Sequence, residues 1–369
     1  MVLKISAVTS TQEFLALKNE WNLLLRECNH TFFSTWDWLS IWWKHFGKNK
    51  KLLILKAEEN GKIVALAPLS YSVYNLYGLK TKKITFMGSP NADYNNFILP
   101  SDRSDECLTK FFEYLCDSTE DKWDTIELED VYDPSVIHFI QNIEGELQTF
   151  SSRALHECLY IKLPSSYDLL YSQLAYKFRQ NLRRSMNNLE KNNKINFKDY
   201  SSNDKVNDGM QVLFELHQKR WKEAGETGAF ADPKIRDFNL DVAQHFNQKN
   251  MLRLVSLNVD EVPSACSYGF VYEGKFYYYL HGVDPAYSRY SVGNLIIVNL
   301  LKKCMAEGLT EFDFLRGDEG YKFRWTQSSR KNYNFVIGKR QLFSKTQNLL
   351  LRNYYYQTKK LLSHLRIPN

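Results

Sequence analysis

The sequence predicts an α/β (α+β) protein built as two copies of one structural plan. The chain has 369 residues, which is long enough for two domains of ordinary size. Its hydrophobic content of 44% and charged content of 24% are typical of a chain that buries a core. The residue pattern also predicts one order of elements, hairpin–strand–helix–strand, twice. We therefore expect two domains, at 1–150 and 151–340, each with a mixed, largely antiparallel sheet flanked by helices.

The first copy begins with helices and continues into a hairpin. Phe14, Leu17 and Trp21 recur at spacings of three and four, which predicts one buried helical face. Asn60-Gly61 lies between two apolar runs and is a strong hairpin signal. The expected elements are helices at 14–24 and 36–46, a hairpin over 52–70, strands at 82–88 and 94–100, a helix at 105–118 and a strand at 123–131.

The second copy repeats this order after a longer helical region. Leu170, Leu174 and Phe178 recur at spacings of four, and Ser165 with Asp168 predicts a capping box at the start of that helix. The expected elements are helices at 168–191 and 210–224, a hairpin over 251–272, a strand at 275–283, a helix at 294–307 and a strand at 311–317.

Several classes of protein are excluded by the sequence. No apolar run approaches the ~18–20 residues needed to cross a membrane. The first residues lack the continuous apolar stretch of a signal peptide, which predicts a cytoplasmic protein. The six cysteines show no CxxC spacing and the eight histidines no HExxH pairing, so we expect no metal site.

A loop rich in small residues joins a predicted strand to a predicted helix over 283–295. The first N–H groups of a helix have no partner inside the helix, and the helix dipole places positive charge at the same end. A pyrophosphate binds well at such a site, and small side chains let it approach the backbone. The expected cofactor-binding residues are Val283, Ser288, Arg289, Tyr290, Ser291, Val292, Gly293 and Asn294.

The same loop resembles the acetyl-CoA loop of the GCN5-related N-acetyltransferase (GNAT) superfamily, whose pattern is roughly V-x-P-x-Y-[RQ]-x-x-G-x-[GA]. The matching positions are Val283, Pro285, Tyr287 and Gly293, whereas Ser288 replaces the Arg or Gln and Ser291 replaces the first Gly. The resemblance implies that acetyl-CoA, or another acyl-CoA, is a co-substrate.

A wider resemblance covers most of the chain. The stretches at 281–295 and 312–325 are similar to the CelD/BcsL-type, BioF2-like acetyltransferase family, whose tandem acetyltransferase folds are related to the FemABX peptidyltransferases. The stretches at 92–100 and 216–225 also look like family features, which implies substrate-binding residues at Asp93 and Trp221. The resemblance implies an acyl-CoA donor and an amine acceptor on an amino sugar or on a cell-envelope or exopolysaccharide precursor.

Charged residues gather at the end of the strand predicted at 311–317. A Lys or Arg there can neutralise the oxyanion of an acyl-transfer reaction or hold an acceptor phosphate. The FemABX resemblance favours Lys322 for this role, with Arg316 nearby, and Asp318 and Tyr321 as substrate contacts. The alternative is a solvated, charged turn.

The sequence leaves the identity of the general base open. His281 lies just before the expected CoA loop, and Asp313 lies in the next strand. A histidine among tyrosines is often a packed core residue, and transfer to an amine can also proceed by positioning alone. Arg179 and Arg183 are one helical turn apart and offer a fork for a phosphate or carboxylate, unless they form a solvated face.

Positive charge is concentrated in two segments. The net charge of +6 divides into +5 over 173–200, +7 over 339–369 and −6 over the remaining chain. We expect 341–369 to form a basic amphipathic helix that docks on the protein or contacts the inner membrane peripherally. Two other functions stay open: a FemABX-like transferase that uses aminoacyl-tRNA, the one nucleic acid considered, and a non-catalytic saccharide-binding module.

Overall fold

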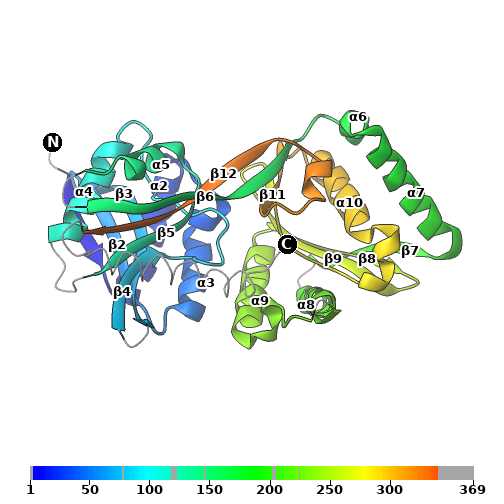
Figure 1. Cartoon of the computed structure of the whole chain (residues 1–369), viewed down its shortest axis with the longest axis horizontal. Helices are drawn as coiled ribbons and strands as arrows, with labels where there is room; N and C mark the ends of the chain where they lie inside the picture. The colour runs from blue at the N-terminus through cyan, green and yellow to red at the C-terminus, as the bar shows by residue number, and fades with distance from the viewer. Residues whose placement is uncertain are drawn as a thin grey trace. The chain divides into compact units, whose positions relative to one another are not determined.

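The structure is a computed structural model that describes residues 3–76, 79–117, 123–144, 147–201, 205–223 and 225–339 (Figure 1). These residues divide into two compact units. The first unit holds the described residues up to 156 and from 331 onward, and the second holds 157–330. Two long strands, β6 (Leu147–Lys162) and β12 (Ser329–Lys339), cross these limits and contribute to both units.

The first unit has the strand order β1-β2-β3-β4-β5-β12. Neighbouring strands are antiparallel except β4 and β5, which are parallel because a helix, α4, connects them. The strands are β1 (Lys4–Val8), β2 (Lys51–Glu59), β3 (Lys62–Leu76), β4 (Leu79–Phe86) and β5 (Thr125–Val131). The helices are α1 (Thr11–Ala16), α2 (Lys18–Leu25), the 3₁₀ turn η1 (Phe32–Ser34), α3 (Trp36–Phe46), α4 (Ser104–Asp117) and α5 (Pro134–Gln141).

The second unit has the matching order β7-β8-β9-β10-β11-β6, again with one parallel pair, β10 and β11. Helices α8 and α9 cover one face of this sheet, and α7 and α10 cover the other (Figure 1). The strands are β7 (Ile195–Asp199), β8 (Leu252–Val259), β9 (Val262–Tyr272), β10 (Lys275–Val283) and β11 (Glu311–Arg316). The helices are α6 (Tyr167–Gln173), α7 (Tyr176–Asn192), α8 (Val206–Glu223), η2 (Ala229–Ala231), α9 (Pro233–Gln248), η3 (Pro285–Tyr290), α10 (Val292–Ala306) and η4 (Lys322–Arg324).

The two units repeat one plan down to a local irregularity. The pairing of β5 with β12 shifts register at a bulge, and so does the pairing of β11 with β6. In each bulge one non-glycine residue has a positive φ, Asp130 at 54° and Leu315 at 59°. The last strand of each sheet, β12 in the first unit and β6 in the second, comes from the other repeat of the chain. The predicted fold class of two similar mixed sheets flanked by helices is confirmed.

Several local predictions were wrong. The helix expected over 168–191 is two helices, because Leu174 is extended, and Ser166 rather than Ser165 caps the first of them. The strand expected at 94–100 forms only isolated bridges. The strands β1, β6, β7 and β12 and the helices α5 and α9 were not predicted, and the segment 341–369 lies outside the described residues.

Each unit has its own apolar core. In the first unit, Trp38 and Trp42 on α3 are fully buried, and Thr35 caps this helix by accepting from the Trp38 N–H at 3.3 Å. In the second unit, Phe276 and Phe312 are fully buried on the parallel pair β10 and β11. Over the residues that the structure describes, no helix is long and apolar enough to cross a membrane.

Candidate active site

Two neighbouring strands of the second unit separate at the point where the sequence places the small-residue loop. β10 pairs with β11 only from Lys275 to Tyr277, and β10 bulges against β9 between Tyr277 and Leu280. A cavity of about 350 Å³ lies where the strands have separated. This volume is in the range of small-molecule sites.

Four parts of the second unit line this cavity, which we call the strand-end cavity. They are α8, the end of β10, the start of α10 with η3 before it, and the turn after β11. The lining residues are Arg220, Tyr278, His281, Val283, Pro285, Ser288, Ser291, Gly293, Asn294, Ile297, Glu319 and Tyr321. Those predicted from the sequence are His281, Val283, Ser288, Ser291, Gly293, Asn294 and Tyr321.

The first turn of α10 offers backbone N–H groups to the strand-end cavity. In the described structure, neither Val292 nor Gly293 donates its N–H to a backbone carbonyl, as is usual at a helix start. A Cβ added at Gly293 would lie 3.3 Å from Val283 Cγ2, so a larger side chain would crowd the cavity wall. Ser291 caps the helix with a left-handed backbone, φ 51° and ψ 40°. This conformation favours glycine, which explains why the GNAT motif has glycine at this position.

Two buried tyrosine hydroxyls of the strand-end cavity make no hydrogen bond of normal geometry within the described residues, although that of Tyr278 interacts with the Ser267 side chain. They are the hydroxyls of Tyr278, which is 2% exposed, and Tyr321. Burial raises the pKa of both phenols far above the ordinary value, so both hydroxyls stay protonated and can donate. Buried polar atoms are usually paired, and a ligand in the cavity would supply the missing acceptors.

His281 lies between the two tyrosines. Its ring stacks on Tyr278 with centroids 5.3 Å apart and meets the edge of Tyr321 at 5.8 Å. Burial, with the positive charges of Arg220 and Lys322, lowers the pKa of His281 to about 3. The imidazole is therefore neutral near pH 7 and is a weak base, which disfavours the general-base role considered from the sequence.

The Lys322 ammonium is completely buried and has three partners. It lies 2.9 Å from the Glu319 carboxylate, and it donates to the backbone oxygens of Arg316 at 2.9 Å and Leu315 at 3.4 Å. A Cβ added at Gly317 would lie 2.5 Å from Glu319 Oε2, so the glycine gives this carboxylate room to fold back over the turn. Lys322 thus holds Glu319 against the strand-end cavity without lining that cavity itself.

The remaining catalytic candidates, Asp313 and Arg316, and the substrate candidate Asp318 lie around the turn and outside the cavity lining. The Asp313 carboxylate is 1% exposed, and it accepts from the Leu315 N–H at 2.7 Å and from Arg330 at 2.9 Å. Arg316 contributes its backbone oxygen to Lys322, and Asp318 is exposed.

The predicted substrate and loop residues are distributed over several places. Trp221 is buried and donates its indole N–H to His217 Nε2 at 3.2 Å. Arg183 lines a separate cavity beside α7, and the Arg179 guanidinium lies over the Tyr171 ring at 6.0 Å. Asp93 is buried in the first unit, where its backbone oxygen accepts from Asn332 at 2.6 Å. Of the loop residues that do not line the strand-end cavity, Arg289 lies over the Tyr290 ring at 4.6 Å and Val292 is buried.

Sequence reasoning did not select Arg220, Tyr278, Ile297 and Glu319. In the sequence, Tyr278 is one of several consecutive aromatic residues in a predicted strand. Its place in the cavity wall follows from the β10 bulge, which the sequence does not predict. Arg220 is brought in by α8, which packs so closely on β10 that a Cβ at Gly282 would lie 2.7 Å from the backbone nitrogen of His217. Of these four residues, only Glu319 could have been selected from the sequence, because it lies within the charged stretch after the strand predicted at 311–317.

The equivalent place in the first unit is filled by the chain itself. β4 and β5 also pair over only three residues, from Lys83 to Thr85. The segment after β4 then folds back, with the Asn95 N–H donating to the Asp130 oxygen at 2.9 Å and Ile98 bridging to Leu66. Tyr94 and Phe97 of this segment are each 1% exposed.

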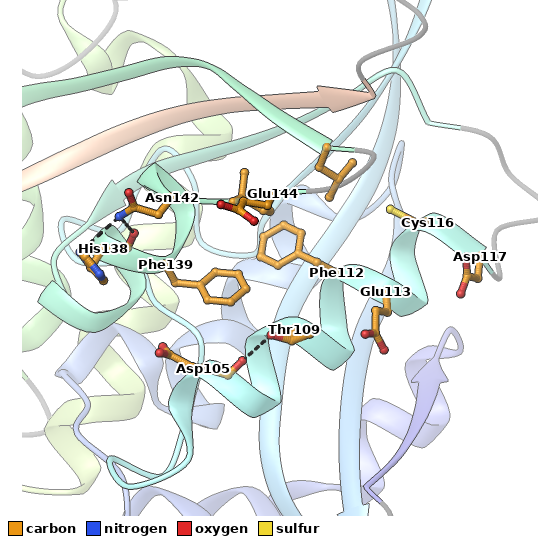
Figure 2. A pocket seen from close by; sticks show the side chains of 12 residues that line it. Asp105, Thr109, Phe112, Glu113, Cys116, Asp117, His138, Phe139, Asn142 and Glu144 are labelled. Carbon is orange, nitrogen blue, oxygen red and sulfur yellow. Dashed lines mark hydrogen bonds between the residues drawn. The ribbon is translucent and has the colours of Figure 1, made fainter.

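The first unit has a cavity of about 550 Å³ elsewhere, between α4 and α5 (Figure 2). In Figure 2 Phe112 and Phe139 lie between the two helices. Four carboxylates also line it, those of Asp105, Glu113, Asp117 and Glu144. These negative charges disfavour a polyphosphate ligand, so we place the candidate site in the strand-end cavity. Across the described ranges, no cluster of His, Cys, Asp or Glu could hold a metal ion.

Comparison with known protein families identifies the segment that carries the strand-end cavity. Residues 176–323 match the family model described as an acetyltransferase (GNAT) domain. This segment is a GNAT-type acetyltransferase domain. The GNAT domain begins at α7, ends in η4 and includes every residue that lines the strand-end cavity. The enzyme class is therefore acyltransferase.

Solved structures show that the fold extends beyond the GNAT domain. FemX shares 10% identity over 90% of this chain and 96% of its own, with a TM-score of 0.61. A conserved protein of unknown function from Bacteroides thetaiotaomicron shares 12% identity over 91% of this chain and 100% of its own, with a TM-score of 0.57. L-PGS from Bacillus licheniformis shares 11% identity over 93% and 96%, with a TM-score of 0.51. No curated protein matches the sequence.

Proposed function

We propose that the protein transfers an acyl group, acetyl in the simplest case, from acyl-CoA to an amine. The observation that carries this proposal is the strand-end cavity. It brings together the start of α10 and two buried tyrosine hydroxyls, of which that of Tyr321 has no hydrogen-bond partner within the described residues. An acyl-CoA has chemistry suited to both ends, because a pyrophosphate suits the helix start and a thioester can accept from the hydroxyls.

Binding begins at the open end of the cavity. The N–H group of Gly293 and the positive end of α10 would hold the pyrophosphate, and the exposed Arg220 adds positive charge. Val283 and Ile297 provide apolar walls for the chain that leads to the thioester. Ser288, at the place of the motif's Arg or Gln, removes a long side chain with N–H donors from the usual pattern. We therefore expect weaker binding than in a GNAT domain with the full motif.

The chemical step uses groups at the closed end. The Glu319 carboxylate, held by Lys322, would bind the acceptor ammonium and take its proton, because an amine must be neutral to attack a carbonyl. The hydroxyls of Tyr278 and Tyr321 would donate to the thioester oxygen as negative charge develops on it, or to the departing thiolate. When bound, the acyl-CoA supplies the activated acyl group.

The acceptor is proposed from the family resemblance. It is an amino sugar or a cell-envelope or exopolysaccharide precursor that carries a primary amine, which would place the enzyme in polysaccharide biosynthesis. The neutral His281 would donate to or accept from a sugar hydroxyl, which a protonated ring could only donate to.

Isothermal titration of the full chain with acetyl-CoA tests the proposal. We expect binding by the wild type and its loss in Gly293→Asp, which places a carboxylate against the pyrophosphate. Ala306→Asp, at the other end of the same helix, introduces the same charge and should bind as the wild type does. Folded wild-type protein that binds no acetyl-CoA at millimolar concentration would end this proposal.

A second candidate donor is aminoacyl-tRNA, which the similarity to the FemX fold favours. The basic α7 is compatible with a nucleic-acid ligand. Binding of tRNA that falls steeply as salt is raised, together with no binding of acetyl-CoA, would support this candidate.

A further inference from the structure

The second unit has another cavity, on the opposite side of α10 from the strand-end cavity. Its volume is about 400 Å³, and it lies between α10 and the pair α6 and α7. We call it the helix groove. The floor is apolar and aromatic, made by Tyr167, Leu182, Met186, Phe197, Leu295 and Val298.

Two cations border the helix groove. Arg183 on α7 and Lys302 on α10 are both exposed, and neither has a carboxylate partner in the part of the chain that the structure describes. Lys302 lies 5.0 Å from the centre of the Tyr167 ring. None of the described residues that line the groove is acidic. The groove thus combines an apolar floor with uncompensated positive charge.

A cavity beside α4 in the first unit has the opposite charge. It also lies beside the helix that connects the parallel strands, α4, but four carboxylates line it. The two cavities share a wall on the helix that connects the parallel strands, but their other walls come from different elements, and the cavities differ in the sign of their charge. An anion is therefore favoured in the second unit and disfavoured in the first.

The shape of the helix groove favours a chain over a compact group. Leu295, Val298 and Lys302 recur at spacings of three and four, so they form a stripe along α10 about 10 Å long at 1.5 Å per residue. Leu182 and Met186 form a parallel stripe one turn long on α7. Tyr171 also lines the groove, and its hydroxyl is fixed by donating to the Arg179 oxygen at 2.9 Å.

We propose that the helix groove binds a single-chain amphiphilic phosphate, with the phosphate between Arg183 and Lys302 and the hydrocarbon chain over the apolar floor. This is a second ligand site, separate from the proposed acyl-CoA site. Arg and Lys side chains are the usual partners of a phosphate, and the floor would bury the chain that water disfavours.

The test uses decyl phosphate below its micellar concentration, titrated calorimetrically into the full chain. We expect binding at one site. Inorganic phosphate and decyl maltoside, which carry only one half of the ligand each, should bind at least tenfold more weakly. Arg183→Gln and Lys302→Gln should each weaken decyl phosphate binding by about tenfold, the effect of one charge-assisted hydrogen bond. Arg184→Gln removes an exposed charge next to Arg183 that does not line the groove, and it should change nothing.

Equal binding by wild type and the double variant Arg183→Gln/Lys302→Gln, or no binding at all, would overturn the proposal. Binding of 3′,5′-ADP without binding of decyl phosphate would also overturn it, and would assign the groove to the nucleotide end of CoA. Acetyl-CoA titrated into the same double variant separates the two proposals. If the double variant still binds acetyl-CoA but no longer binds decyl phosphate, both proposed sites are supported. Each of the two proposals can also fail while the other holds.

Discussion

Replacement of Lys322 by methionine tests whether this residue supports the site or acts on the substrate. The change removes an ion pair of 2.9 Å to Glu319 and two hydrogen bonds to the backbone oxygens of Arg316 and Leu315. Methionine keeps most of the buried volume. Loss of one partner of a buried pair costs about 3–5 kcal/mol of unfolding free energy. The Glu319 side chain is 21% exposed and can be partly hydrated, so we expect about 3 kcal/mol, the low end of that range.

The assay is denaturant unfolding of the full chain together with acetyl-CoA turnover. For a folding unit of 150–250 residues, such a loss lowers the melting temperature by about 6–12 °C. Arg324→Met removes an exposed cation two residues away and should stay within about 0.5 kcal/mol of wild type. A Lys322→Met protein that unfolds like wild type but has lost turnover would refute the reasoning, because the ammonium would then act on the reacting groups.

Three further changes probe the backbone and the charge of the site. Ser291→Gly relieves a left-handed backbone conformation that costs an L-residue about 1–2 kcal/mol, so thermal unfolding should shift upward and acetyl-CoA binding should be kept. Gly282→Ala places a Cβ 2.7 Å from the His217 backbone nitrogen and should cost about 1–3 kcal/mol or more in denaturant unfolding, since α8 must move. The pKa of His281 is lowered to about 3, so the folded protein binds fewer protons than the unfolded chain between pH 3 and pH 6.5. Stability should therefore fall as pH falls through this range, by at most ~1.4 kcal/mol per pH unit from this group. Unfolding curves at several pH values should show a smaller dependence of stability on pH in His281→Gln than in the wild type. An unchanged slope in His281→Gln would contradict the low pKa.

Strong local signals in the sequence predicted most of the elements around the site. The Asn60-Gly61 turn gave the hairpin of β2 and β3, and the small-residue loop gave the junction of β10 and α10. These signals depend on nearby residues alone. β7 was missed because it has only five residues, and the alternation of Ile195 and Phe197 with polar residues is too short to mark a strand within a polar stretch. The break at Leu174 was missed because the apolar spacing continues across it while the backbone does not.

The site was harder to predict than the fold because its members meet through irregular backbone. The loop residues Ser291 and Gly293 were found from a linear motif. Tyr278 enters the cavity through a bulge, and Arg220 through close packing of α8 at Gly282, and neither event has a local sequence signal. Lys322 was selected for its charge, yet only the folded turn shows that its ammonium is occupied by three partners.

The exchange of final strands limits how the two repeats can evolve. Deletion of either repeat would remove the strand that completes the other sheet and would leave β5 or β11 with an unpaired edge, which promotes aggregation. The first repeat therefore supplies a strand that the second sheet needs, even though its own strand-end opening is filled by its own chain.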